Sequence, residues 1–101
     1  MSETDSTPLT IQREDGATRG RYHIALAPGY EAEMTFSKQP NGNITIDHTG
    51  VPSEFGGRGI AAMLVNRAIA DARAEGFKIT PVCSYVVAQF RRHPEWADLL
   101  A

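Results

Sequence analysis

Three side chains in this sequence could take part in nucleophilic chemistry or proton transfer: His48, Cys83 and Tyr85. Cys83 lies just before a predicted helix, whose dipole would favour the thiolate, so it could attack a substrate or exchange protons. A histidine titrates near neutral pH and suits general base catalysis. Tyr85 could donate a proton to a leaving group. Each also has a structural interpretation: a small buried hydrophobe for Cys83, a core hydrogen bond for His48 and packing for Tyr85.

The segment from Val51 to Ala61 could bind an anion. Its sequence is Val-Pro-Ser-Glu-Phe-Gly-Gly-Arg-Gly-Ile-Ala, so a strand end is followed by three glycines and then by a helical pattern. The first amides of a helix have no internal acceptors, and glycines let the backbone approach a phosphate closely. We therefore predict a pyrophosphate site on the amides of residues 57–61, with Arg58 near a further phosphate. The alternative is a tight strand-to-helix turn without a ligand.

Two common phosphate-binding motifs do not match this segment. A nucleotide P-loop needs Gly-Lys-Ser or Gly-Lys-Thr, and a dinucleotide fingerprint needs a third glycine where Met63 stands. The net charge of −2 and the pI near 5.9 disfavour duplex nucleic acid, which binds proteins through many cations. The three histidines are too widely spread for a metal site.

The composition is that of a soluble globular protein, with 42% hydrophobic and 22% charged residues in a chain of 101. We expect a disordered polar tail at residues 1–7 and a single domain at residues 8–101. No apolar run is long enough to span a membrane. Cys83 is the only cysteine and no apolar signal segment follows Met1, so we expect a reducing, cytoplasmic location.

Periodicity places the reactive residues on a sheet and two helices. Alternating apolar residues and turn signals predict four antiparallel strands, at residues 9–13, 20–26, 30–36 and 43–51. Apolar spacings of three and four predict a helix at residues 59–75, which Gly76 ends. A buried strand at residues 77–81 should then run parallel to strand 43–51, because a helix joins the two.

A second helix is predicted from an N-cap at Ser84 to about His93, where Pro94 ends it, and Trp96 should anchor a terminal turn. The predicted fold class is therefore α/β (α+β). It has a mostly antiparallel twisted sheet of about five strands, one parallel βαβ crossover and a C-terminal helix.

Four motifs in order resemble the small YjdJ-type members of the GNAT N-acetyltransferase superfamily. The match covers about residues 22–99, and the motifs are Asp47-His48-Thr49-x-Val51-Pro52, Gly57-Arg58-Gly59-Ile60-Ala61, Pro81-x-Cys83-Ser84-Tyr85 and Arg91-Arg92-His93-Pro94-Glu95-Trp96. In that superfamily the pattern Gln/Arg-x-x-Gly-x-Gly/Ala binds the pyrophosphate of acetyl-CoA. Gly56 stands here where Gln or Arg is usual. The resemblance implies that acetyl-CoA is bound by Val51, Gly56, Gly57, Arg58, Gly59, Ile60 and Ala61.

The resemblance also implies transfer of an acetyl group from acetyl-CoA to an amine, such as a protein lysine or N-terminus. Strands 43–51 and 77–81 should splay apart to admit the pantetheine arm, and Cys83 and His48 correspond to catalytic candidates of the small members. The helices that shape an acceptor site in larger relatives are missing. A non-catalytic CoA-binding or protein-interaction module is therefore the alternative. We expect a monomer or weak homodimer that binds no metal, nucleic acid or membrane.

Overall fold

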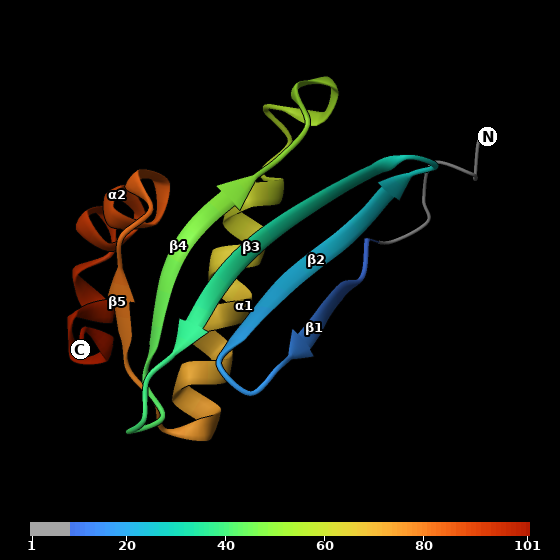
Figure 1. The fold of residues 1–101 in the computed structure, drawn as a ribbon. Helices are drawn as coiled ribbons and strands as arrows, with labels where there is room; N and C mark the ends of the chain where they lie inside the picture. Colours follow the sequence, from blue (N-terminus) through green and yellow to red (C-terminus); the bar gives the residue numbers. More distant parts are fainter. Residues whose placement is uncertain (1–8) are drawn as a thin grey trace.

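The structure is a computed structural model that describes residues 9–101, so the tail predicted at residues 1–7 lies outside the described residues. A five-stranded sheet is packed against one long helix, with a second helix beside the last strand (Figure 1). The elements in chain order are β1 (Ile11–Asp15), β2 (Arg19–Ala27), β3 (Tyr30–Lys38), β4 (Ile44–Gly50), the 3₁₀ helix η2 (Ser53–Phe55), α1 (Ile60–Glu75), β5 (Ile79–Pro81), α2 (Ser84–Arg92) and the 3₁₀ helix η3 (Pro94–Leu99).

The strands lie in the order β1-β2-β3-β4-β5. The first three pairings are antiparallel, as short turns require, and β4 pairs with β5 in parallel because α1 carries the chain back across the sheet. The predicted fold class is therefore confirmed. None of the helices in the described residues is both long and apolar enough to cross a membrane.

Helix α1 covers one face of the sheet and closes the main core. Its buried stripe contains Leu64, Val65, Ala68, Ile69 and Ala72, which recur at the helical spacing seen in the sequence. Opposite them lie the inward side chains of the central strands, which are fully buried or nearly so: Tyr22, Ile24, Ala32, Met34, Phe36 and Ile46. Gly76 has φ of +81° and ends the helix, as predicted.

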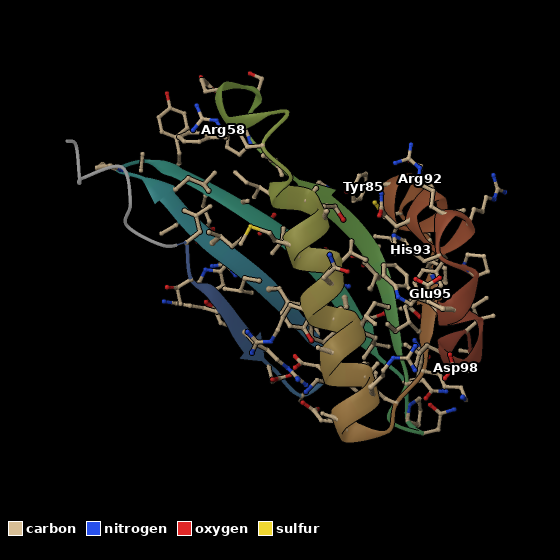
Figure 2. The ribbon with its side chains drawn as sticks, turned by 180° about the vertical axis from the view of Figure 1, so that it is seen from behind. Arg58, Tyr85, Arg92, His93, Glu95 and Asp98 are labelled. Atoms are coloured by element: carbon tan, nitrogen blue, oxygen red, sulfur yellow. The ribbon has the colours of Figure 1, made fainter. Side chains whose placement is uncertain are left out.

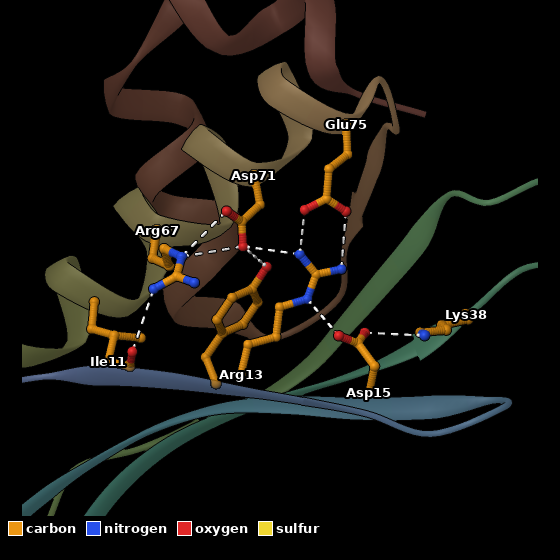
Figure 3. Close-up of polar contacts among 8 residues, drawn as sticks. Ile11, Arg13, Asp15, Lys38, Arg67, Asp71 and Glu75 are labelled. Atoms are coloured by element: carbon orange, nitrogen blue, oxygen red, sulfur yellow. Dashed lines mark hydrogen bonds and ion pairs between the residues drawn. The ribbon is translucent and has the colours of Figure 1, made fainter.

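A polar network fastens the edge strand β1 to α1 (Figure 3). The Asp71 carboxylate accepts hydrogen bonds from the Tyr22 hydroxyl at 2.8 Å, from Arg13 at 3.1 Å and from Arg67 at 3.2 Å. Arg13 also donates to Glu75 at 2.6 Å. Because the Tyr22 ring is completely buried, its hydroxyl needs such an acceptor at the rim of the core.

Several predicted boundaries were wrong by a few residues. β1 begins at Ile11 rather than residue 9 and includes Asp15, because the turn closes later, where the Gly16 amide donates to the Arg19 carbonyl at 2.7 Å. β5 begins at Ile79 rather than at residue 77. The 3₁₀ helix η2 was not predicted, since its three residues are too few to show periodicity.

The predicted N-cap of the second helix was also wrong by one residue. Cys83 has the non-helical cap conformation, and Ser84 is already the first residue of α2. His93 and Pro94 end α2 as predicted. The terminal turn is η3, in which Trp96 is buried and packs edge-on against Phe90, with ring centroids 5.5 Å apart.

Candidate acyl-donor and catalytic site

The predicted site residues gather where β4 and β5 end and where α1 and α2 begin (Figures 1 and 2). The parallel ladder between the two strands stops at the pair Ile46 and Pro81. The amides of Val82 and Cys83 then both donate to the Ile46 carbonyl, at 3.0 and 3.1 Å, and the chain turns into α2. β4 continues to Gly50, so its last residues extend past the end of β5.

A glycine turn leads from this edge into α1. Gly57 and Gly59 have φ of +77° and +76°, a left-handed conformation that other residues adopt only with strain. A methyl group at either position would meet nothing within 4 Å. Glycine is therefore favoured here by the backbone conformation and not by a lack of space. Gly59 is the N-cap of α1, and no side chain among residues 9–101 caps the helix.

The amides at the start of α1 are therefore free to bind an anion. The first turn holds no acidic residue, and the first amide on the helix with an internal acceptor is that of Met63, which donates to the Gly59 carbonyl at 3.1 Å. Gly56 differs from the other predicted ligands. Its amide donates to the Ser53 carbonyl at 3.1 Å, where it ends η2, and is already in use.

Aromatic contacts hold the glycine turn in place. The guanidinium carbon of Arg58 lies 5.1 Å from the centre of the Phe55 ring, and that ring lies 5.4 Å from the ring of Tyr30 in the β2–β3 hairpin. Arg58 is itself exposed, in the turn that precedes α1 (Figure 2). Val51, between β4 and η2, is half-buried against the core. The turn thus presents a cation and amide donors to solvent from a fixed position.

Cys83 lies half-buried between β4 and α2. Its Sγ is 3.5 Å from the Thr49 hydroxyl, and as the N-cap residue it adjoins the first amides of α2. Burial alone would raise the pKa of Cys83, but the Thr49 hydroxyl and the amides of Val86 and Tyr85 outweigh it, so the pKa is lower than the usual thiol value. The sulfur is therefore more thiolate-like than that of an ordinary buried cysteine.

A β-bulge in β4 decides where His48 points. Thr35 pairs with His48 and Phe36 with Ile46, so Asp47 is an extra residue in β4. Without the bulge, strand alternation would place His48 on the same face as Ile46, which is buried against α1. His48 instead lies on the opposite face, and 58% of its side chain is exposed. The interpretation of His48 as a core hydrogen-bonding residue was therefore wrong.

The structure places Cys83 and His48 on opposite sides of β4. Cys83 contacts Thr49, whereas the nearest charged partner of His48 is Glu33, with Nε2 and Oε2 3.8 Å apart on the face away from α1. Tyr85 lies in the first turn of α2 and packs partly against the core. Sequence reasoning missed Thr49. Its motif was visible, but only the bulge brings this hydroxyl round to Cys83.

A hollow of about 360 Å³ lies elsewhere, on the sheet face away from α1. Glu14, Arg19, Gly20 and Thr35 line it, and none of the predicted site residues does. The candidate site is at the ends of β4 and β5 and the starts of the two helices. Amide donors, a cation, a thiol and an imidazole all lie at this end of the fold, with the imidazole on the face away from α1.

Two comparisons with known proteins concern the family and the fold of the chain. A family model described as GCN5-related N-acetyl-transferase matches residues 21–99. The solution NMR structure of a protein from Staphylococcus aureus, described as a candidate GCN5-like N-acetyltransferase, matches with a TM-score of 0.68 and 26% sequence identity. That match covers 94% of this chain and 90% of the other.

Proposed function

The chain belongs to the GCN5-related N-acetyltransferase family, and from this premise we propose that it binds acetyl-CoA and transfers the acetyl group to an amine. The observation that carries the proposal is the glycine turn at the start of α1. Its free amides and the exposed Arg58 suit the phosphates of CoA, and the turn follows directly on the end of β4. The family as a whole uses acetyl-CoA.

In this proposal the amides of residues 57–61 hold the pyrophosphate, and Gly56 shapes the turn without donating its amide. The pantetheine arm lies along the part of β4 that extends past β5, with Cys83 on one side of that strand and His48 on the other. Parallel strands with helices at their carboxyl ends commonly place ligands at such a position.

In the proposed reaction the acetyl group moves from the sulfur of CoA to the nitrogen of the amine. The amine nitrogen forms a bond to the acetyl carbon, the carbon–sulfur bond breaks, and its electron pair goes to the CoA sulfur. His48, on the outer side of β4, accepts the proton that the amine loses, and Tyr85 or Cys83 protonates the CoA thiolate. A second route passes the acetyl group through Cys83, whose lowered pKa favours the thiolate that would attack.

The alternative function is a non-catalytic module that binds CoA or an acyl-CoA, or that contacts other proteins. One observation favours it: His48 and Cys83 lie on different sides of β4 and have different partners. A base and a nucleophile that acted on one another would be within hydrogen-bonding distance. In this alternative, the helix amides still bind the ligand but no acetyl group is transferred.

Calorimetric titration with acetyl-CoA and CoA tests the binding claim. We expect a dissociation constant below about 1 mM. If no heat of binding is detected at millimolar ligand, both candidate functions are wrong. Release of free CoA thiol with a panel of amines, including lysine peptides and peptide N-termini, then tests transfer. Turnover that falls in His48→Ala supports the enzyme, whereas binding without turnover for any amine supports the module.

We also propose that the chain belongs to the YjdJ-type group, that it is a monomer or a weak dimer, and that its acceptor is a large exposed amine. A cytoplasmic location suits the proposed role of Cys83, because a reducing compartment keeps a lone thiol free.

A further inference from the structure

Three side chains from three neighbouring strands form a row on the sheet face away from α1. Arg21 of β2 donates from Nη1 to Oε1 of Glu33 in β3 at 3.1 Å. The other oxygen of Glu33, Oε2, faces Nε2 of His48 in β4 at 3.8 Å. One oxygen of Glu33 is thus fixed by a guanidinium while the second is turned toward the imidazole. The reaction described above assigns no task to Glu33.

Gly50 provides a second, independent constraint on the same imidazole. It pairs with Glu33 across the two strands and lies two residues after His48. A Cβ at Gly50 would lie 3.1 Å from Nε2 of His48, which is tighter than most such contacts, and 3.5 Å from its Cε1, which is an ordinary contact. The ring therefore lies close to the backbone of Gly50, and a side chain there would require it to shift by a few tenths of an ångström.

We infer that Glu33 is a positioning residue for His48, with Gly50 leaving the space that the positioned ring needs. The inference rests on the proposed function, in which His48 takes the proton of the acceptor amine. A separation of 3.8 Å is too long for a direct hydrogen bond, so Glu33 acts through its charge or through a bridging water. A carboxylate facing Nε2 favours the tautomer that carries its proton there.

This positioning determines which ring nitrogen of His48 acts as the base. With the proton held on Nε2 and turned toward Glu33, Nδ1 is the nitrogen that accepts the proton of the amine. The imidazolium formed in this step is stabilised by the Glu33 carboxylate, which Arg21 holds in place. The same proton then leaves Nδ1 for solvent, which is open to this exposed ring.

The test compares Glu33→Gln with Glu31→Gln. Glu31 lies on the same strand and also binds Arg21, at 2.7 Å, but its second contact is His23. The two variants therefore remove the same charge from the same guanidinium, and only one of them faces His48. Nitrogen-15 NMR of the His48 ring reports the tautomer, and free-thiol release from acetyl-CoA with the best amine of the panel reports kcat and KM.

We expect Glu33→Gln to lower the share of the Nε2-protonated tautomer and to reduce kcat roughly tenfold, a fraction of what a general base contributes. The KM for acetyl-CoA should not change. Glu33→Asp should recover part of kcat, and Glu31→Gln should match the wild type in both measurements. Gly50→Ala, which keeps the carboxylate, should change the ring signals and lower kcat in the same way.

Two results would overturn the inference. One is a tautomer ratio that is the same in Glu33→Gln and the wild type, which would show that Glu33 does not position the ring. The other is a changed ratio with an unchanged kcat, which would remove Glu33 from the reaction. If the wild type releases no thiol with any amine, the proposed function fails by itself, and the tautomer ratio still decides whether Glu33 positions His48.

Discussion

The hydroxyl of Thr49 and the sulfur of Cys83 lie 3.5 Å apart and join the extended end of β4 to the start of α2. The contact depends on the bulge at Asp47, which turns Thr49 toward α2 and His48 toward the opposite face. It gives Cys83 a hydrogen-bonding partner that can stabilise a thiolate.

Replacing Thr49 by Val should raise the pKa of Cys83, because the variant keeps the burial that opposes ionisation and loses the hydroxyl that favours it. The measurement is the rate of alkylation by iodoacetamide between pH 6 and pH 10. We expect the pH dependence of the wild-type rate to have its midpoint below that of an ordinary thiol. The midpoint for Thr49→Val should lie at a higher pH. Thr49→Ser, which restores a hydroxyl, is the control. Equal midpoints for Val and the wild type would contradict the role of Thr49.

Replacing Gly59 by Ala should weaken the binding of acetyl-CoA by roughly tenfold or more, the range of hydrogen bonds to charged groups. Alanine disfavours the φ of +76° that aims the first amides of α1. The matched control is Gly42→Ala, since Gly42 has φ of +94°, a Cβ there would meet nothing within 4 Å, and it lies in the β3–β4 turn and not in the glycine turn before α1.

Both glycine variants should lose about 1–2 kcal/mol of stability in urea denaturation. Only Gly59→Ala should lose affinity in calorimetry. An equal loss of affinity in Gly42→Ala would mean that general destabilisation, and not the geometry of the glycine turn before α1, explains the effect.

Replacing Tyr22 by Phe should destabilise the protein by about 1 kcal/mol, because it removes the hydroxyl that donates to Asp71 at 2.8 Å and leaves the buried ring in place. Urea denaturation measures the change. Tyr30→Phe is the control, since the Tyr30 hydroxyl is exposed and contacts Glu54 only at 3.4 Å. A Tyr22→Phe variant as stable as Tyr30→Phe would show that the network adds nothing to the attachment of β1.

Acid should weaken the same region through Asp15. Burial alone would raise the pKa of this carboxyl, but hydrogen bonds from Lys38 and Arg13 lower it below 3.8. A carboxyl whose pKa is lowered in the folded state adds stability above its unfolded pKa, and that stability is lost as the pH falls through the folded value.

Asp15→Asn should therefore cost less than about 1 kcal/mol at pH 7, since the side chain is partly exposed, and less at pH 2 than at pH 7. Urea denaturation at the two pH values tests this. A cost that is the same at both would mean that the effect does not come from the charge of Asp15.

The sequence by itself determined the order of strands and helices and the position of the glycine turn. These features depend on local physics: the helical period of α1 is carried by its own residues, and the glycines before Ile60 allow a conformation that neighbours need not impose. The strand ends and the cap at Cys83 were wrong by one or two residues, because they depend on which carbonyl a given amide reaches in the folded sheet.

Only the tertiary structure decided which side of β4 each reactive group occupies. The alternation of apolar residues gives no sign of an extra residue at Asp47, since a bulge is defined by pairing with a second strand. One unpaired residue moves His48 away from the core and toward Glu33, and it brings Thr49 to Cys83. Residue types predicted the chemistry at this end of the fold, and long-range strand pairing determined the contacts that could direct it.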